Sequence, residues 1–424
     1  MSIKYKKLVL LEDGVPKYLQ DENGVFLTSK DVVDDYISND EIEQAIRGKI
    51  TKRYFRVYLL HEDETIKEDI TNHVILTGSL EKTYQQGQTR SLTLTLMNPE
   101  QIWYPSPIKG KLWRNTKIRL DMGVQLEDTV YWVQEGVFVV QDPDLSNTGS
   151  NATVTLQLCD KFGLLDGTIS GTTEQDIEIP LGTNIERAMM KLLKQERNKM
   201  GDVYDEKSIS FPVKYKDSKT AYTIKKTSHS TIGEILIDLA NMISCDIFYD
   251  EYGHLVVRNN LDDLDYHNRT IAWNFRDTDI DLEHNGVTMK HEWAKIKNKI
   301  IVIGANINGL ICKGVAENNN DASPYSVNGN FGIQTEIITD DLIYTPALCE
   351  GRALYELKKN AMRNIQIKFN CIYIPHIIPN DLVRWSFDAY NLLNEELVVQ
   401  SVSIPLNPKE LMSVSVTNIK ELPL

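Results

Sequence analysis

The side chains of this chain that could bind a metal ion occur in two short motifs, and both are incomplete. Asp277, Asp279 and Asp281 have the spacing of a calcium-binding loop. Such a loop needs glycine at its sixth position and glutamate at its twelfth, where this chain has Leu282 and Thr288. The series is therefore interpreted as the acidic face of a strand.

The second motif begins at His291 and Glu292, as in zinc-dependent peptidases, but the position of the second histidine is occupied by Lys295. The sequence also has no Gly-x-Ser-x-Gly nucleophile motif, no phosphate-binding loop and no Gly-x-Gly-x-x-Gly dinucleotide motif. We therefore predict no catalytic, cofactor-binding or metal-binding residues, no cofactor, and no enzymatic activity.

The composition of the chain argues against several classes of protein. The 424 residues have a formal net charge of −14, which argues against a nucleic-acid-binding or anionic-membrane surface as the main function. No apolar run reaches the length of a signal-peptide core or a membrane span, so we expect no stable membrane insertion. The 5 cysteines include no Cys-x-x-Cys pair, which suits free thiols in a cytoplasm.

Strand patterns dominate the stretch from Thr51 to Gly167. Residues 91–96 and 153–158 alternate strictly between apolar and polar side chains, as strands with one buried face do. Short β-branched or aromatic runs lie between them at 117–120, 130–133 and 137–140. This stretch is predicted to be a first β-barrel domain.

Part of the same pattern returns near the C-terminus. Asn115 to Leu120, a Val-Val-Gln at 139–141 and the alternating run from Thr153 are matched in order by Asn380 to Trp385, a Val-Val-Gln at 398–400 and an alternating run from Met412. Order and spacing together favour two copies of one β unit over chance similarity between strands.

The rest of the chain divides by composition. Residues 1–50 are expected to form a hairpin and an acidic helix, which serve either as a lid on the first barrel or as a docking arm. Residues 168–260 are expected to form a mixed α/β domain, with a helix at 185–193, a second helix capped by Thr231 and Glu234, and a hairpin with its turn at 251–253.

Residues 261–424 are expected to form the second β-barrel domain, with one helix that begins at Pro346 and buries Leu348, Leu354, Leu357 and Ala361. The predicted fold class is therefore mainly β with an α+β insertion: two related β-barrel domains that flank a mixed α/β domain.

Tryptophans in the first β domain have two interpretations. Prolines make the loop from Trp103 to Pro107 rigid, and rigid aromatic loops are good interface anchors. The alternative, which we favour, is a barrel corner whose aromatics cap the core together with Trp113 and Trp132. Trp132 is expected to fill the barrel interior.

Several of these segments resemble the hub proteins beneath the tail tube of tailed phages and related contractile injection systems. The resemblance lies in residues 132–138, in the unit from Thr231 to Arg258 with its Tyr-Asp-x-x-Gly-His-Leu end, and in Asn380 to Val383. It covers most of residues 51–424. Some relatives carry a lysozyme or peptidase domain after the hub, whereas Leu424 follows the last predicted strand closely.

The resemblance implies a structural virion protein of the tail baseplate or tip, made and assembled in the host cytoplasm. It implies a homotrimer that joins the hexameric tail tube, or distal tail proteins, to a trimeric spike or fibre, with the tape measure protein as a further neighbour. DNA would pass through the lumen without specific binding. The alternatives are a tail-associated cell-wall hydrolase used in entry and a receptor-binding or sugar-binding tail module, with residues 103–107 and 317–332 as contact loops.

Overall fold

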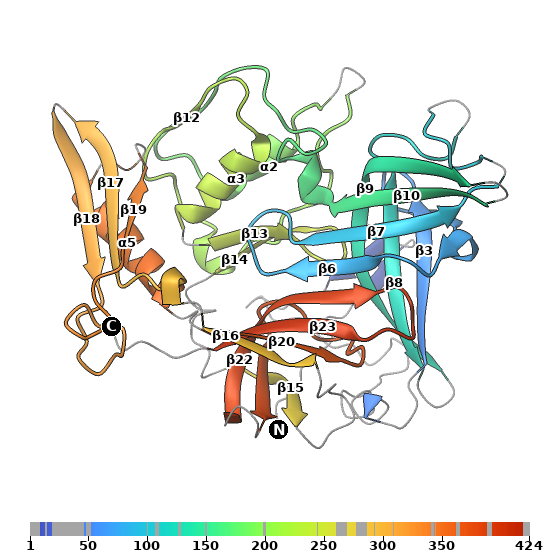
Figure 1. Cartoon of the computed structure of the whole chain (residues 1–424). Helices are drawn as coiled ribbons and strands as arrows, with labels where there is room; N and C mark the ends of the chain where they lie inside the picture. Colours follow the sequence, from blue (N-terminus) through green and yellow to red (C-terminus); the bar gives the residue numbers. More distant parts are fainter. Residues whose placement is uncertain are drawn as a thin grey trace.

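The computed structural model describes most of the chain (Figure 1). The described residues are 9–12, 15–18, 46–47, 52–99, 101–106, 110–125, 129–148, 151–197, 201–243, 245–259, 269–276, 286–291, 293–307, 309–340, 343, 345–361, 365–387 and 392–418.

Strands predominate, which confirms the mainly β class. A 14-stranded sheet has the order β16-β20-β23-β22-β6-β7-β10-β9-β8-β3-β4, with β5 paired to β7 and β21 paired to β15 and β22. Within the described residues its two ends, β16 and β4, do not pair with each other. Its strands are β3 (Arg53–Leu60), β4 (Ile66–Asp69), β5 (Val74–Ile75), β6 (Ser79–Thr83), β7 (Arg90–Met97), β8 (Lys117–Gln125), β9 (Val130–Thr148), β10 (Asn151–Asp160), β15 (Ile271–Arg276), β16 (Thr288–His291), β20 (Ile365–Cys371), β21 (Leu382–Phe387), β22 (Leu392–Pro405) and β23 (Met412–Asn418).

We call β3 to β10 the first β unit, and β15, β16 and β20 to β23 the second β unit. All the strand runs expected in the first unit are confirmed, and the two runs at 130–133 and 137–140 belong to one long strand, β9. Alternation in β7 buries Leu92, Leu94 and Leu96. The apolar face of the strands thus faces the core.

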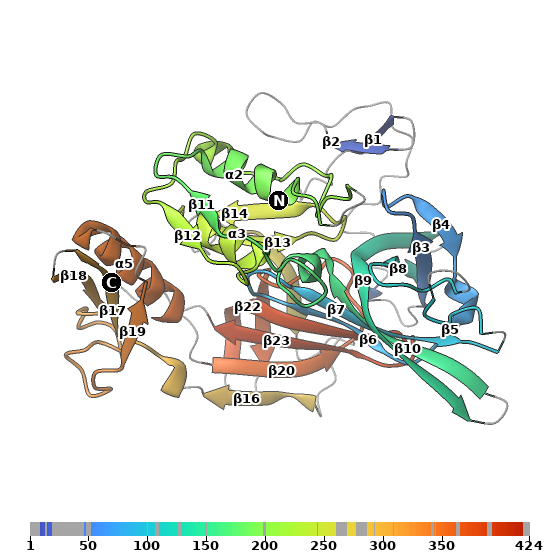
Figure 2. The same cartoon turned by 90° about the horizontal axis from the view of Figure 1, so that it is seen from above.

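The two β units are joined by main-chain pairing and share one core. Strand β22 pairs antiparallel with β6 from Ser401–Thr83 to Pro405–Ser79 (Figure 2). A buried polar network also connects them, because Glu135 of the first unit accepts hydrogen bonds from Lys82 and from the hydroxyl of Tyr373. Burial, followed by the charge of Glu135, raises the pKa of Tyr373 well above its ordinary value, so this phenol stays protonated.

The middle segment, residues 161–259, packs on the first unit. It contains β11 (Ile177–Ile179), α2 (Ile185–Leu193), β12 (Ile224–Lys226), α3 (Ile232–Asn241), β13 (Cys245–Tyr249) and β14 (Leu255–Asn259), with short 3₁₀ turns at Lys161–Leu164 and Val213–Tyr215. The predicted capping box is present, since Thr231 Oγ1 accepts from the Glu234 amide and the Glu234 carboxylate accepts from the Thr231 amide. The predicted turn at 251–253 joins β13 to β14, with Gly253 at φ 74°.

Residues 293–361 form a separate layer beside the middle segment (Figure 1). It comprises a 3₁₀ turn (Trp293–Lys295), β17 (Lys299–Ile307), β18 (Leu310–Glu317), β19 (Thr335–Thr339) and α5 (Pro346–Ala361). Ile300, Val302 and Leu357 share a hydrophobic core with α2 and α3. These residues fall inside the range 261–424, yet they pack on the middle segment and not on the 14-stranded sheet.

The expected buried face of α5 was partly wrong. Leu357 is buried, but Leu348 and Leu354 are 39% and 45% exposed, and the side chain of Ala361 lies outside the described residues. Cys349 and Ala353 face β17 and β18 instead, because Gly314 lets the helix backbone come close: a Cβ there would lie 2.2 Å from the carbonyl carbon of Cys349. Leucine would not fit in that contact.

At the N-terminus, β1 (Val9–Glu12) and β2 (Val15–Tyr18) form the hairpin that was expected within residues 1–50. Most of the expected acidic helix lies outside the described residues. Ile46 is buried in the core that the two β units share, and the Arg47 guanidinium lies 4.5 Å from the ring centre of Trp273. In the part of the chain that the structure describes, no helix has the length and apolar character required to cross a bilayer.

Candidate interface at the edge of strand β9

The described residues hold no group of three or more His, Cys, Asp or Glu side chains that could bind a metal ion. The Asp277 to Glu283 series lies outside them. His291 is exposed on β16, and Lys295 lies in the following 3₁₀ turn. The structural features that could carry function are therefore sought in surfaces and strand edges.

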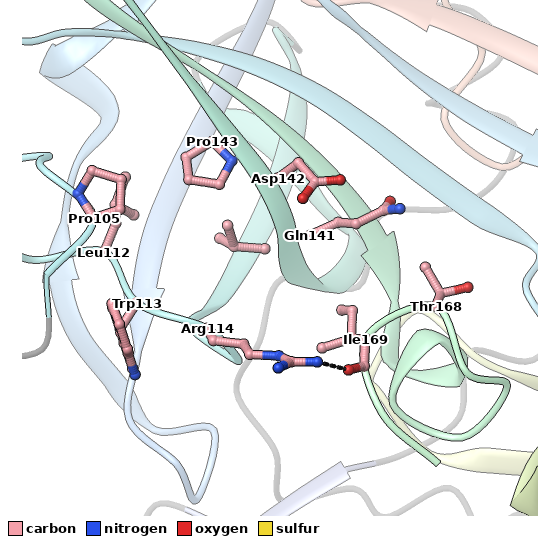
Figure 3. Close-up of a pocket in the computed structure, with 10 residues that line it drawn as sticks. Pro105, Leu112, Trp113, Arg114, Gln141, Asp142, Pro143, Thr168 and Ile169 are labelled. Carbon is pink, nitrogen blue, oxygen red and sulfur yellow. Dashed lines mark hydrogen bonds between the residues drawn. The ribbon is translucent and has the colours of Figure 1, made fainter. Parts of the chain in front are cut away.

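A cavity of about 310 Å³ opens in the first unit, where β9 passes the loop that precedes β8 (Figure 3). Trp113 contributes an indole that is 51% exposed. Arg114 closes one side, where its guanidinium donates to the carbonyl oxygen of Ile169. The lining residues are Pro105, Leu112, Trp113, Arg114, Val140, Gln141, Asp142, Pro143, Thr168 and Ile169.

The loop beside this cavity has a close counterpart in the second unit. Asn115 has φ 72° and Asn380 has φ 77°, a left-handed conformation that asparagine tolerates better than most residues. The residue after each asparagine accepts the same main-chain hydrogen bond, from Val140 to Thr116 at 3.0 Å and from Val399 to Asp381 at 2.9 Å. The two loops therefore lead into their strands, β8 and β21, with the same backbone geometry.

Gln141 and Gln400 both occupy a β-bulge. In the first unit Val140 pairs with Leu158 and Asp142 with Gln157, so Gln141 is the extra residue. In the second, Val399 pairs with Val416 and Ser401 with Ser415, so Gln400 is the extra residue. A bulge bends its strand and turns the residues after it in a new direction. Strands β9 and β22 therefore bend at equivalent points.

The equivalence extends across five strands. One row of paired residues in the first unit crosses β8, β9, β10, β7 and β6, and its counterpart crosses β21, β22, β23, β20 and β16. The rows are Lys117, Val139, Cys159, Ser91 and Glu81, and Leu382, Val398, Thr417, Gln366 and Lys290. The next neighbours differ, because β3 is antiparallel to β8 whereas β15 is parallel to β21.

Beyond the bulges the two units have different neighbours. In β22, residues 401–405 pair with β6 of the first unit, and the Tyr84 amide donates to the Gln400 carbonyl at 2.8 Å. A second cavity of about 310 Å³ at this junction is lined by Lys82, Tyr84, Ile378 and Pro379, among others. In β9, residues 142–148 pair with β10 alone among the described strands.

A buried charge cluster fixes the first unit to the middle segment. The Lys161 ammonium lies 2.7 Å from Glu64 and 2.8 Å from Asp205, and Tyr249 donates to Asp205. Burial alone raises the pKa of Glu64, but Lys161, Lys117 and Lys207 outweigh it and bring the pKa to about 2. Glu64 is therefore ionised around neutral pH.

Sequence reasoning placed two tryptophans incorrectly. Trp103 is fully buried, as expected for an aromatic side chain that caps the core, while the neighbouring Tyr104 is 52% exposed. Trp113 is exposed and does not cap the core. Trp132 is only partly buried, because its ring lies on the outer side of the sheet under the Arg56 guanidinium at 3.7 Å. The open edge of β9 was not predicted, although Pro143 within it is a typical edge-strand signal.

Comparison with known proteins gave matches in structure alone. No family model and no curated protein sequence matches the chain. The chain is similar to the 43 kDa tail protein of prophage MuSo2 from Shewanella oneidensis, with a TM-score of 0.57 at 14% identity over 86% of this chain and 98% of that one. It has the fold of a prophage tail protein. The resemblance inferred from the sequence is thereby confirmed at the level of fold.

Two further tail-protein structures agree with this. The tail protein from Neisseria meningitidis MC58 has a TM-score of 0.55 at 10% identity, over 87% of this chain and 97% of that chain. The prophage tail protein gp18 from Listeria monocytogenes EGD-e has a TM-score of 0.52 at 10% identity, over 86% and 95%. The tail-protein fold thus spans nearly the whole of each of these chains.

Proposed function

We propose that this chain is a structural virion protein, a baseplate or tail-tip hub that links a tail tube to a spike or fibre. The observation that carries the proposal is the row-by-row equivalence of five strands in the two β units. The tail-protein fold supports the same interpretation.

In this proposal each chain supplies two related β-barrel domains, within residues 51–167 and 261–424, that flank the mixed α/β domain at 168–260. The layer at 293–361 belongs with the middle domain by its core. Three chains would then present six similar β units to a hexameric tube and three middle domains to a trimeric spike. A ring of this kind changes sixfold symmetry to threefold symmetry, with cyclic closure as the usual solution for identical chains.

The proposed neighbours are tail tube or distal tail proteins, the tape measure protein, and spike or fibre proteins, in an assembly built in the host cytoplasm. The ring would leave a channel for DNA that does not bind it specifically. Acidic net charge supports this, because a lumen rich in lysine and arginine would retain phosphates.

Native mass spectrometry and electron microscopy of the full chain test the proposal. We expect particles of three chains that form closed rings with pseudo-sixfold symmetry around the channel. Dimers, open filaments, or a protein that stays monomeric at every accessible concentration would contradict it.

A further inference from the structure

The junction between β22 and β6 provides a model for a second junction that one chain cannot form by itself. At the internal junction, Val402 pairs with Lys82, Ser403 with Glu81 and Ile404 with Leu80. The counterpart of β22 is β9, and the counterpart of β6 is β16, because Leu80 pairs with Leu92 as Met289 pairs with Ile367. The chain therefore carries both strands that a second junction of this kind would need, β9 and β16.

These two edges are far apart within one molecule. β16 is one end of the sheet order, while β9 is the fourth strand from the other end. Figure 2 shows β16 along one side of the second unit, and the long ends of β9 and β10 projecting beyond the first. Contact between them requires a second copy of the chain, joined head to tail.

We propose that β9 of one copy pairs with β16 of the next copy, and that Trp293 of that next copy enters the cavity beside Trp113. This inference rests on the proposed ring and specifies its subunit contact. The intrachain register translates into four cross-strand pairs: Pro143 with His291, Asp144 with Lys290, Leu145 with Met289, and Ser146 with Thr288.

Side-chain chemistry suits that register. Asp144 faces Lys290, and opposite charges across a strand pair are favourable. Leu145 is 44% exposed, and it faces the thioether of Met289. Pro143 has no amide hydrogen, so this junction has one main-chain donor fewer than the junction between β22 and β6. A proline on an open strand edge also discourages pairing with wrong partners.

The cavity explains two exposed tryptophans. Trp293 stands two residues after His291, as Tyr84 stands two residues after Lys82. Tyr84 donates its amide to the bulge residue Gln400, so Trp293 would donate to Gln141, which lines the cavity. The side chains of Trp113 and Trp293 are 51% and 63% exposed. Tryptophans that become buried at the centre of an interface contribute much of its affinity.

Paired cysteines in the full chain test the register. Residues opposite each other in an antiparallel pair have Cα atoms about 4.5–5.5 Å apart, which is within the range that a disulfide spans. We expect Leu145→Cys with Met289→Cys to give covalent trimers under mild oxidation. Leu145→Cys with Lys290→Cys, which is shifted by one residue and faces the other side of the sheet, should give only background. The five native cysteines are buried and none of them forms a disulfide, so they interfere little.

Association measurements test the tryptophans. We expect Trp293→Ala and Trp113→Ala each to weaken assembly about tenfold or more. The matched control is Leu310→Ala on β18, a side chain 78% exposed and remote from both edges, which should leave assembly unchanged. Thermal unfolding of each variant shows whether the chain itself is intact.

The outcomes separate the two proposals. A ring that forms without the 145–289 cross-link, and that Trp293→Ala does not weaken, overturns this contact while the ring stands. A chain that never assembles overturns both the ring and the contact.

Discussion

Asn115 and Asn380 share a left-handed backbone conformation, at φ 72° and φ 77°, and each stands two residues before the first residue of its strand, β8 or β21. A left-handed conformation costs roughly 1–2 kcal/mol for most L-residues and little for glycine. Asn115→Ala should therefore lower the free energy of unfolding by about 1 kcal/mol relative to Asn115→Gly. Asn380→Ala should likewise be less stable than Asn380→Gly. Denaturant unfolding of the four variants measures both differences.

Asn147 provides the control for that pair. It is exposed on the strand β9, where alanine should be more stable than glycine by about 0.5–1 kcal/mol. If alanine were more stable than glycine at position 115 as well as at position 147, the left-handed conformation of the loop would not be retained.

Because the pKa of Glu64 is low in the folded chain, the free energy of unfolding should depend on pH. Its pKa of about 2 in the folded chain lies below the ordinary value of 4.5, so its ionised form stabilises the fold above about pH 4.5, and the contribution is lost as the pH falls toward 2. We expect Glu64→Gln to lower the free energy of unfolding near pH 7 by about 3 kcal/mol. The difference from the native chain should shrink between pH 4.5 and 2, as chemical denaturation at each pH would show.

Asp63→Asn is the matched control, because Asp63 is a fully exposed neighbour whose carboxylate accepts hydrogen bonds from the amide and the hydroxyl of Thr65. A Glu64→Gln difference that stays constant from pH 7 to pH 2 would mean that the ion pairs with Lys161, Lys117 and Lys207 do not hold the carboxylate ionised.

Two tryptophans of the first unit should differ in their contribution to stability. Trp103 is fully buried in the shared core, so Trp103→Ala should cost about 3–5 kcal/mol. Trp132 is partly exposed and contacts Arg56 and Tyr54, so Trp132→Ala should cost about 1–2 kcal/mol. Equal losses in urea unfolding would contradict this placement of the two side chains.

The proposed channel should not retain DNA. With a net charge of −14, we expect the assembled protein to bind duplex DNA no tighter than about 100 μM at physiological salt. Fluorescence anisotropy with a labelled duplex at several salt concentrations measures this. Tight binding that weakens steeply with added salt would indicate a basic lumen.

The chain should not hydrolyse peptidoglycan, because the sequence carries none of the catalytic motifs considered above and the described residues hold no metal-binding cluster. A cell-wall gel incubated with the purified protein should stay turbid, with a lysozyme as positive control. Clearing at catalytic concentrations would favour the cell-wall hydrolase alternative.

The sequence by itself determined the local structure. Alternation predicted β7 and β10, the Thr231 and Glu234 spacing predicted a capping box, and the repeated asparagine and Val-Val-Gln marked equivalent strands. These signals are local, because strand period, capping and left-handed turns depend on residues within a few positions of each other.

Tertiary structure alone decided which strands and faces meet. No local sequence signal specifies that β22 pairs with β6, about 320 residues away, or that one edge of β9 has no partner strand beyond Gln141 among the described strands. Whether Trp103 or Trp132 fills the core, and whether Cys349 or Leu348 faces the sheet, depends on the space left by distant elements such as Gly314. Hydrophobic period specifies that a face is buried, whereas the neighbour that covers it is selected by packing among segments far apart in the chain.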